Sequence, residues 1–483
     1  MIRMCSGIWV ESTTSVAFAA PGDSISVNTL IINRAGIDVK LRAIHLFSAL
    51  KVDTLLNVTL DNNTPVSLNL PVRIPENAEF TSPYWLIREN NGAMFTLDQP
   101  QNIVYAQNPP VFNTRFELLI GNETIDLVIP VIYRWNDPIK GERQRPFTIL
   151  PPVSVGFESN TQVFTNSRPR NIITTIQANG TSITGELSLR LPEGWTVTPE
   201  AVPFQLENNA ALRVTFTVTA SGHASSGSGQ VIAKIAGKTY SQQISEIDYD
   251  HIVPQTVLSP ATSRFIKLDM IVPNKQIGYI MGSGDEIPDA LSQLGYSVTL
   301  LSDDDLEKSD LSHYQTIICG VRAFNTRTEL IRLQDRLVDY VKNGGTWIVQ
   351  HNTRFGNRFS HIGPIPFSTA GRDRISEEEA KITILEPDHP LMNYPNKITE
   401  NDFSDWVQER GLYFADSWDP GFTPILSGND TGEPAKSGGL LYAEYGNGIF
   451  IFTGYAWFRQ LPAGVPGAYR IFVNLISAKA QGK

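Results

Sequence analysis

The chain has 483 residues, which is too long for one ordinary domain and indicates two to four. Hydrophobic residues make up 41% of it and charged residues 18%, a balance that excludes a disordered protein. The net charge of −10 and the lack of long basic runs argue against a nucleic-acid partner, because binding a phosphate backbone needs clustered Lys and Arg.

Cysteine content and apolar runs constrain the compartment only weakly. The sequence has two cysteines, Cys5 and Cys319, which excludes a disulfide framework and any metal-type cysteine spacing. No apolar stretch is long enough for a membrane span. The first residues resemble a signal peptide, but Glu11 and the Ser-Thr-Thr run at 12–14 interrupt the apolar region. We therefore interpret this segment as the lead into a first strand, and the localisation stays open.

Residues 1–150 are predicted to form a β-sandwich. Segments such as 23–34 and 39–46 alternate apolar and polar side chains with a period of two, which is typical of half-buried strands. Turn-forming runs such as APGD (20–23) and LDNNTP (60–65) separate the strands. Regularly spaced strands of this kind favour a sandwich.

Residues 151–248 are predicted to form a second, smaller Ig-like sandwich. Leu187, Leu189 and Leu191 alternate along one strand, and a Pro-Glu-Gly turn at 192–194 then leads to Trp195. This strand, turn and tryptophan resemble the small Ig-like accessory sandwiches attached to bacterial carbohydrate-active enzymes. Residues 249–266 are expected to be a linker.

Residues 267–483 change to a strand–helix alternation. Predicted strands at 275–281, 297–301 and 316–320 are interleaved with predicted helices, of which 326–345 carries one apolar face and ends at Gly344. This order predicts a parallel sheet with helices on both faces. The expected fold class is therefore two all-β Ig-like sandwiches followed by an α/β flavodoxin-like domain.

The glycines at 282 and 284 follow a predicted strand, as in dinucleotide-binding proteins, but the third glycine of that motif is replaced by Ile287. Asp285 and Glu286 would repel a pyrophosphate, and they instead suit the positive N-terminal end of a helix. We expect no cofactor at this position.

The strand at 346–350 ends in Gln350-His351-Asn352, the position that carries the nucleophile in many α/β hydrolases and amidotransferases. No Ser or Cys stands there. Cys319 lies in an apolar run and is interpreted as a buried core thiol. No histidine follows His389, so Cys-His glutamine hydrolysis is excluded, and no catalytic residue is assigned.

Polar residues follow two neighbouring predicted strands, whose carboxyl ends should share one edge of the sheet. These candidate binders of a polar or anionic ligand are Arg322, Asn325, His351, Asn352 and Arg354. The alternative is that they satisfy the backbone groups of loops. A second group, Trp406, Arg459 and Gln460, belongs to aromatic-rich segments that suit sugar stacking and suit a packed core equally well.

Metal binding has little support in the sequence. The seven histidines are scattered without a ligand motif, and the only tight acid–histidine cluster is Asp248-x-Asp250-His251. We interpret this cluster as a hydrogen-bonded loop and expect no metal.

Several long motifs in the last domain resemble a known family. GYIMGSGDEIPDALSQLGYSVTLL, YVKNGGTWIVQHNT, DHPLMNYPNKITENDFSDWVQERGLYF and FRQLPAGVPGAYR are similar to the C-terminal region of large Bacteroidetes-type PIG-L (LmbE-like) deacetylase proteins. In that family a zinc-dependent deacetylase domain precedes β-sandwich segments and a class I glutamine amidotransferase-like, or trehalose-utilisation-like, domain. The resemblance extends upstream through YDHIVPQ to CSGIWVES.

The zinc motif of that family, of the A-H-P-D-D-E type with a later H-x-x-H, does not occur here, and Asp388-His389-Pro390 is only a look-alike. The resemblance therefore implies a non-catalytic accessory region that binds a glycan or glycoconjugate, with a deacetylase domain as partner in cis or in trans. Relatives of this layout are often exported, which would imply a periplasmic or secreted bacterial protein. The competing hypothesis is a hydrolase-type enzyme that uses His351 as base with an acid such as Asp402.

Overall fold

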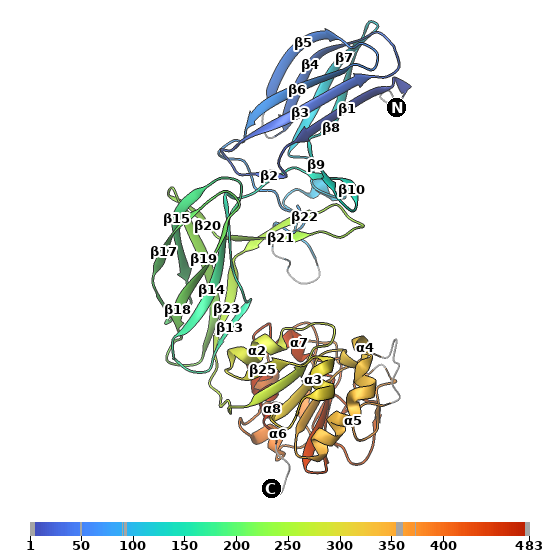
Figure 1. Cartoon of the computed structure of the whole chain (residues 1–483). Coiled ribbons are helices and arrows are strands. Elements are labelled where there is room, and N and C mark those ends of the chain that lie inside the picture. The colour runs from blue at the N-terminus through green and yellow to red at the C-terminus, as the bar shows by residue number, and fades with distance from the viewer. Residues whose placement is uncertain are drawn as a thin grey trace.

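The computed structural model describes residues 5–48, 51–88, 90, 94–353, 361–371 and 373–478. Strands dominate these residues, and they form three bodies that follow one another along the chain (Figure 1). The chain is thus a β-rich protein with several separate sheets.

The first body consists of two sheets packed face to face over a shared core. Alternate residues of each strand point inward, as in β3, where Ile25, Val27 and Ile31 are buried. One sheet has the order β10-β9-β1-β3-β6, with bounds Gly141–Pro146, Ile132–Asp137, Ile8–Thr14, Ser24–Asn33 and Pro65–Arg73. The other has the order β5-β4-β7-β8, with bounds Val52–Thr59, Val39–Ser48, Phe112–Ile120 and Glu123–Pro130. The short strands β2 (Phe18–Ala19) and β11 (Thr148–Ile149) pair beside them, and a 3-10 helix, η1, spans Pro100–Val104.

The second body is also a sandwich. One sheet has the order β12-β14-β18-β16, with bounds Val153–Phe157, Arg170–Ala178, Ala211–Thr219 and Thr196–Thr198. The other has the order β13-β23-β19-β15-β17, with bounds Thr161–Phe164, Thr262–Lys267, Ser225–Ile235, Ile183–Arg190 and Ala201–Leu206; β20 (Lys238–Tyr240) also pairs with β19. Trp195 fills the centre of this core, with its ring 5.0 Å from Phe164 and 5.5 Å from Phe265.

The expected linker at 249–266 is wrong for most of its length. The structure instead has β22 (Gln255–Pro260), which pairs with β21 (Gln242–Ile247), and then β23. β23 pairs with β13 and β19 inside the second sandwich. The sequence suggested a linker because the pairing partners of β23 lie about 100 residues upstream at β13 and about 35 upstream at β19, which no local pattern records.

The third body is built on a sheet of order β25-β24-β26-β27-β34-β33-β31. Its bounds are Ser297–Leu300, Gln276–Ile280, Thr316–Cys319, Thr346–Gln350, Gly448–Thr453, Leu440–Tyr445 and Thr423–Pro424. The first five are parallel neighbours, and β33 and β31 are antiparallel. Numbered along the chain, the parallel strands have the order 2-1-3-4-5.

Helices cover both faces of this sheet. Alternate residues of its buried strands therefore pack in two separate cores, one on each face. Ile318 and Ile348 pack in the core with α2 and α8, whereas Trp347 and Val349 pack in the core with α3 and α5. The helices are α2 (Ile287–Gln293), α3 (Asp303–Lys308), α4 (Ala323–Thr326), α5 (Glu329–Lys342), α6 (Pro390–Asn393), α7 (Trp457–Gln460), α8 (Pro466–Ile476) and the 3-10 helix η2 (Glu400–Phe403). Two short ribbons complete the body, β28 (Phe367–Ser368) with β30 (Ser417–Trp418) and β29 (Ile382–Ile384) with β32 (Leu426–Gly428).

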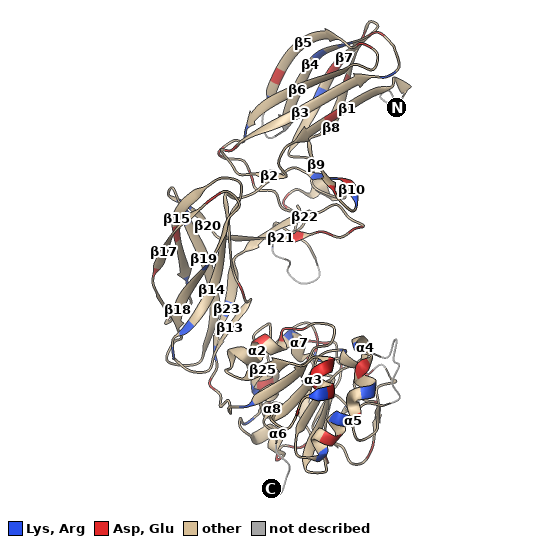
Figure 2. Cartoon of the chain, viewed as in Figure 1, with Lys and Arg blue, Asp and Glu red and all other residues tan. Residues whose placement is uncertain are grey.

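The outer surfaces of α3 and α5 carry both charge signs (Figure 2). Arg332 of α5 lies 2.9 Å from Glu307 of α3 and 3.1 Å from Glu329. The predicted apolar face of α5 is confirmed, since Leu330, Leu333 and Leu337 are buried.

The second sandwich and the third body share one continuous core. Val163 and Ile266, from β13 and β23, are buried in the same cluster as residues of α2 and α8, and both strands end beside α2 (Figure 1). Gln293 of α2 accepts a bond from the Val163 amide (2.8 Å) and donates one to the Thr161 carbonyl (3.0 Å). This joint resembles the interior of a domain more than a flexible linker.

Candidate functional site

His351 lies directly after β27, at the carboxyl end of the parallel sheet. It is only 4% exposed, and its Nδ1 is buried without a hydrogen-bond partner among the residues that the structure describes. The ring packs against Tyr413 and Phe458, with centroids 5.5 Å away in each case. A buried imidazole nitrogen with no partner is rare, because a lost hydrogen bond is costly, and it marks a place where a ligand could bond.

The charge state of His351 follows from its surroundings. Burial, and then the positive charges of Arg322 and Arg459, lower the pKa of His351 to about 4. Glu409 offsets part of the second charge, because its carboxylate lies 2.8 Å from Nε of Arg459. The imidazole is therefore neutral at pH 7.

Backbone strain gathers around the same histidine. Arg322, Gln408 and Tyr413 have φ values of +59°, +66° and +55°, a region that residues with side chains rarely adopt. The amide of Arg322 donates to the His351 carbonyl (2.9 Å), Tyr413 packs on the His351 ring, and Gln408 accepts a bond from Arg459. Strained residues of this kind cluster at functional sites, where the surrounding structure holds them in place.

The two asparagines of the candidate set hold loops in place. Asn352 accepts from the Phe324 amide (2.9 Å) and donates to the Gln350 carbonyl (3.1 Å). Asn325 bonds both the amide and the carbonyl of Thr353, at 2.7 and 2.9 Å. These bonds satisfy the backbone groups of loops, which is the alternative that the sequence left open.

Of the three candidates in the aromatic-rich segments, Trp406 and Gln460 are buried rather than displayed, whereas Arg459 is half-buried. Trp406 is 3% exposed, donates to the Asp402 carbonyl (3.1 Å) and packs edge-on against Trp457. Gln460 is fully buried and bonds the backbone of Val407. Neither residue shares a contact with His351 in the described parts of the chain, and Arg354 lies outside the described residues.

Asp402, the acid of the hydrolase hypothesis, is engaged elsewhere. One oxygen accepts from the Thr399 amide (2.8 Å) and hydroxyl (3.2 Å), and the other lies 3.0 Å from Nε of Arg470. The carboxylate caps η2 and is 8% exposed. The Asp402 carboxylate is therefore held by capping the start of η2 and by its ion pair with Arg470 of α8.

A buried polar network, which the sequence did not reveal, lies under the strand ends. The Tyr279 hydroxyl donates to the Asp285 carboxylate (2.7 Å) and accepts from Nε2 of Gln350 (3.2 Å). Burial raises the pKa of Asp285, which also accepts from the Ile287 amide at the start of α2 (3.1 Å). Tyr279 could not be found from its sequence context, because its strand reads as ordinary core.

Gly282 has a packing role rather than a phosphate-binding one. A Cβ at this position would lie 2.0 Å from the Val321 carbonyl oxygen, and Ser283 donates its amide to that same oxygen (2.9 Å). The glycine thus allows the loop after β24 to touch the loop after β26.

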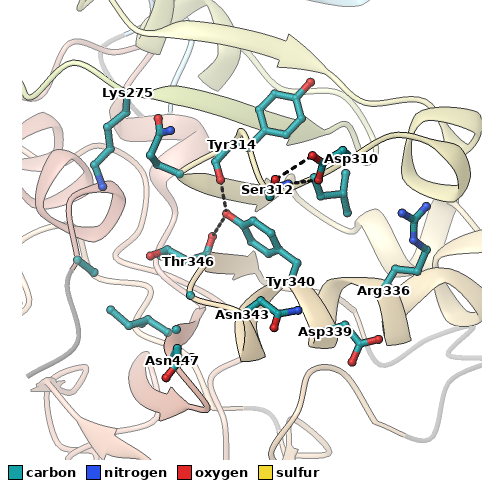
Figure 3. A pocket seen from close by; sticks show the side chains of 17 residues that line it. Lys275, Asp310, Ser312, Tyr314, Arg336, Asp339, Tyr340, Asn343, Thr346 and Asn447 are labelled. Carbon is teal, nitrogen blue, oxygen red and sulfur yellow. Dashed lines mark hydrogen bonds between the residues drawn. The ribbon is translucent and has the colours of Figure 1, made fainter. Parts of the chain in front are cut away.

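A hollow of about 690 Å³ lies at the opposite, amino-terminal end of the strands (Figure 3). The Tyr340 hydroxyl there bonds the carbonyls of Tyr314 (3.0 Å) and Thr346 (3.3 Å). Nζ of Lys275 donates to the Ile476 carbonyl (2.8 Å), and Ser312 bonds Asp310 (2.9 Å). These polar groups are already bound within the protein, and ligands of α/β sheets bind at the other end.

The described ranges contain no group of three or more His, Cys, Asp or Glu residues able to hold a metal ion. In the Asp248-x-Asp250-His251 segment, Asp248 lies 3.4 Å from Arg143, Asp250 pairs with Lys140, and His251 stacks on Tyr249. Among the same described residues, no helix is long and apolar enough to cross a membrane.

Comparison with known proteins gives one family match. Residues 168–237 match the NPCBM-associated, NEW3 domain of alpha-galactosidase. These residues run from β14 to β19 and lie in the second sandwich. This all-β body is thus similar to a domain associated with carbohydrate binding. No curated protein matches the chain.

Among solved structures, the chain is similar at low scores to bacterial alpha-2-macroglobulins. The Salmonella protein reacted with methylamine has 9% identity and a TM-score of 0.19, over 53% of this chain and 16% of that one. The native E. coli protein has 10% identity and a TM-score of 0.19, over 54% and 17%. A family 123 glycoside hydrolase from Clostridium perfringens has 10% identity and a TM-score of 0.18, over 41% and 38%. The chain therefore spans well under half of each of these structures, and the scores assign no fold.

Proposed function

We propose that this chain is a glycan-binding accessory protein rather than an enzyme. The observation that carries the proposal is the match of residues 168–237 to the NPCBM-associated, NEW3 domain of alpha-galactosidase. The shared core around Val163 fixes this sandwich to the α/β body, so a glycan held by one would be presented at a fixed position to the other.

The carboxyl end of the α/β sheet is the proposed ligand site, with His351, Arg322 and Arg459 as its binding residues. Two guanidinium groups beside a neutral imidazole suit an anionic group, such as the carboxylate of an acidic sugar. The unpartnered Nδ1 of His351 supplies a further hydrogen bond.

Binding is favoured over hydrolysis by the chemistry of His351. A general base works best when its pKa lies near the operating pH, and a pKa of about 4 makes this imidazole a weak base. A catalytic histidine is usually oriented by an acid, and the Asp402 carboxylate is bound to Thr399 and Arg470 instead. The hydrolase remains the second candidate, on the grounds that His351 is buried amid strained backbone.

The finer assignments are also proposals. The strand order 2-1-3-4-5 supports a flavodoxin-like domain over residues 267–483, and the sheets support sandwiches over residues 1–150 and from 151 onward. The motifs from GYIMGSGDEIPDAL to FRQLPAGVPGAYR support an amidotransferase-like relative of the PIG-L C-terminal region, with a deacetylase domain as partner.

Calorimetric titration with tetragalacturonate tests the proposed site. We expect binding that weakens about ten-fold or more in R322A and H351A, because each loses a charge-assisted or buried hydrogen bond. His223, which is exposed in the second sandwich, gives the matched control H223A. Equal binding by H351A and H223A would remove this site from the proposal.

The deacetylase partner is tested by the size of the native protein in its source cells, measured by immunoblot. A band roughly 30 kDa above 53.5 kDa, about one domain of 250 residues, is the expected result for a partner in cis. A band at 53.5 kDa, with no deacetylase recovered after crosslinking, would contradict both arrangements.

A further inference from the structure

A second cleft lies between the first and second sandwiches, far along the chain from His351. Its volume is about 1040 Å³. The first sandwich contributes loop residues between Pro75 and Val111, and the second contributes Gln230, Ser241 and the end of β22. A cavity of this size is large enough for an oligosaccharide segment.

The walls of this cleft are held by hydrogen bonds on both sides. Ser82 joins the first sandwich to the β21–β22 ribbon, because its hydroxyl accepts from the Leu258 amide (3.3 Å). Asn108 ties the facing loops together by accepting from the Tyr84 amide (2.9 Å) and donating to the Ser82 carbonyl (2.7 Å). The cleft is thus formed before a ligand arrives, which lowers the entropic cost of binding.

The lining is rich in groups that both donate and accept hydrogen bonds. Among the described residues, six carboxamides line the cleft: Asn77, Gln99, Asn102, Asn108, Gln230 and Gln242. Asn108 bonds within the protein through both of its amide atoms, whereas Asn102, Gln230 and Gln242 bond through one. An amide can pair with a sugar hydroxyl in either direction. In the parts of the chain that the structure describes, this lining includes Glu79 and Asp98 and no Lys, Arg or His. Asp98 is paired with Arg88, so the negative charge of the lining rests mainly on Glu79, which disfavours an anionic ligand but not a neutral polyhydroxylated one.

Apolar side chains stand exposed on the loop that borders the cleft. Ile87, Ile103 and Tyr105 are 56%, 71% and 52% exposed. Exposed apolar groups rimming a polar hollow are typical of ligand grooves. The C–H faces of sugar rings are the part of a glycan that packs on such side chains.

We propose that the cleft between the two sandwiches binds a neutral oligosaccharide. This goes beyond the proposed function, since it adds a site of opposite electrostatic character to the one at His351. Neutral segments of a glycan would lie in the amide-lined cleft, and acidic groups would be excluded from it.

The test is calorimetric titration with neutral hexasaccharides of gluco-, galacto-, manno- and xylo-configuration, beside tetragalacturonate. At least one neutral sugar is expected to bind with a Kd of about 1 mM or below. The double variant N77A/Q242A should weaken it about ten-fold, because two amide partners are lost, whereas the control H223A, at an exposed histidine, should leave it unchanged. Absence of binding by all four neutral sugars, or equal binding by N77A/Q242A, overturns the proposal.

Hydrogen exchange on the full wild-type chain localises the ligand without relying on a variant's fold. The same neutral sugar should slow exchange in residues 75–84 and 241–260 and leave 346–353 unaffected. Slowing confined to 346–353 would overturn the cleft while leaving glycan binding in place. Loss of tetragalacturonate binding in H351A bears only on the proposed function, so the proposals for the cleft and for the His351 site can fail separately.

Discussion

Protonation of His351 should destabilise the folded chain as the pH falls below about 6.5. The pKa of this ring is lowered from 6.5 to about 4 in the folded state, so the unfolded state binds a proton first. Stability that is complete above pH 6.5 is then lost progressively as the pH falls towards 4. This dependence of stability on pH is opposite to that of a histidine that gains an acidic partner on folding.

The magnitude follows from the two pKa values. One pKa unit corresponds to about 1.4 kcal/mol. For a shift from 6.5 to about 4, the linkage relation gives a loss of about 2 kcal/mol between pH 7 and pH 5. The loss reaches about 3 kcal/mol at pH 4. The ring is 4% exposed, so solvent screening reduces this little.

NMR titration of chain labelled at the histidine Cε1 positions measures the pKa directly, and H351Q identifies the signal by its absence. Urea unfolding of wild type and H351Q at pH 7 and pH 5 measures the linked stability, with H223Q as matched control. We expect H351Q to lose about 2 kcal/mol less than wild type over this interval. A His351 signal that titrates near pH 6.5, or identical losses in wild type and H351Q, would refute the reasoning.

Three further outcomes follow from contacts elsewhere in the chain. R322A should raise the pKa of His351, and R459A should raise it less, because Glu409 already offsets the Arg459 charge. The same NMR titration checks this prediction, and an unchanged His351 pKa in R322A would contradict it. Q293A should lower the free energy of unfolding in urea by about 2–4 kcal/mol, because the Val163 amide and the Thr161 carbonyl lose their partner. In the control S292A, at the exposed neighbouring residue, the free energy of unfolding should change by about 0.5 kcal/mol or less. Dithiobis-nitrobenzoate should modify Cys5 quickly and Cys319 only after unfolding, since burial raises the pKa of the Cys319 thiol to about 12; equal rates for the two thiols would count against this.

The features that could be predicted from sequence are those set by local periodicity. The helical spacing of Leu330, Leu333 and Leu337 gave the buried face of α5, and the alternation of Leu187 and Leu189 gave a strand of the second sandwich. Cys319 was correctly interpreted as a core thiol, because two isoleucines precede it in its strand.

What the sequence could not supply depends on pairings between distant residues. The segment that forms β23 falls largely within the linker expected at 249–266, because no local pattern reveals its partner β13 about 100 residues upstream. From the sequence, Trp406 and Gln460 suited a sugar-binding surface and a packed core equally well, and only the fold shows that the first packs on Trp457 and the second bonds Val407. The strain at Tyr413 and the network through Tyr279 also arise from tertiary contacts.

The two joints between the three bodies differ in physical kind. The second sandwich meets the α/β body through a shared apolar core and the buried bonds of Gln293, which resist opening. Beyond the bonds of Ser82, the first sandwich meets the second through ion pairs between ribbons, such as Arg143 with Asp248 (3.4 Å) and Arg145 with Glu246 (2.8 Å). These acids are half exposed, so each pair contributes about 1 kcal/mol or less and weakens with salt. The amide-lined cleft lies at this joint, where the bonds of Ser82 and Asn108 hold its walls, so a sugar that bridges Asn77 and Gln242 would add contacts that salt does not weaken.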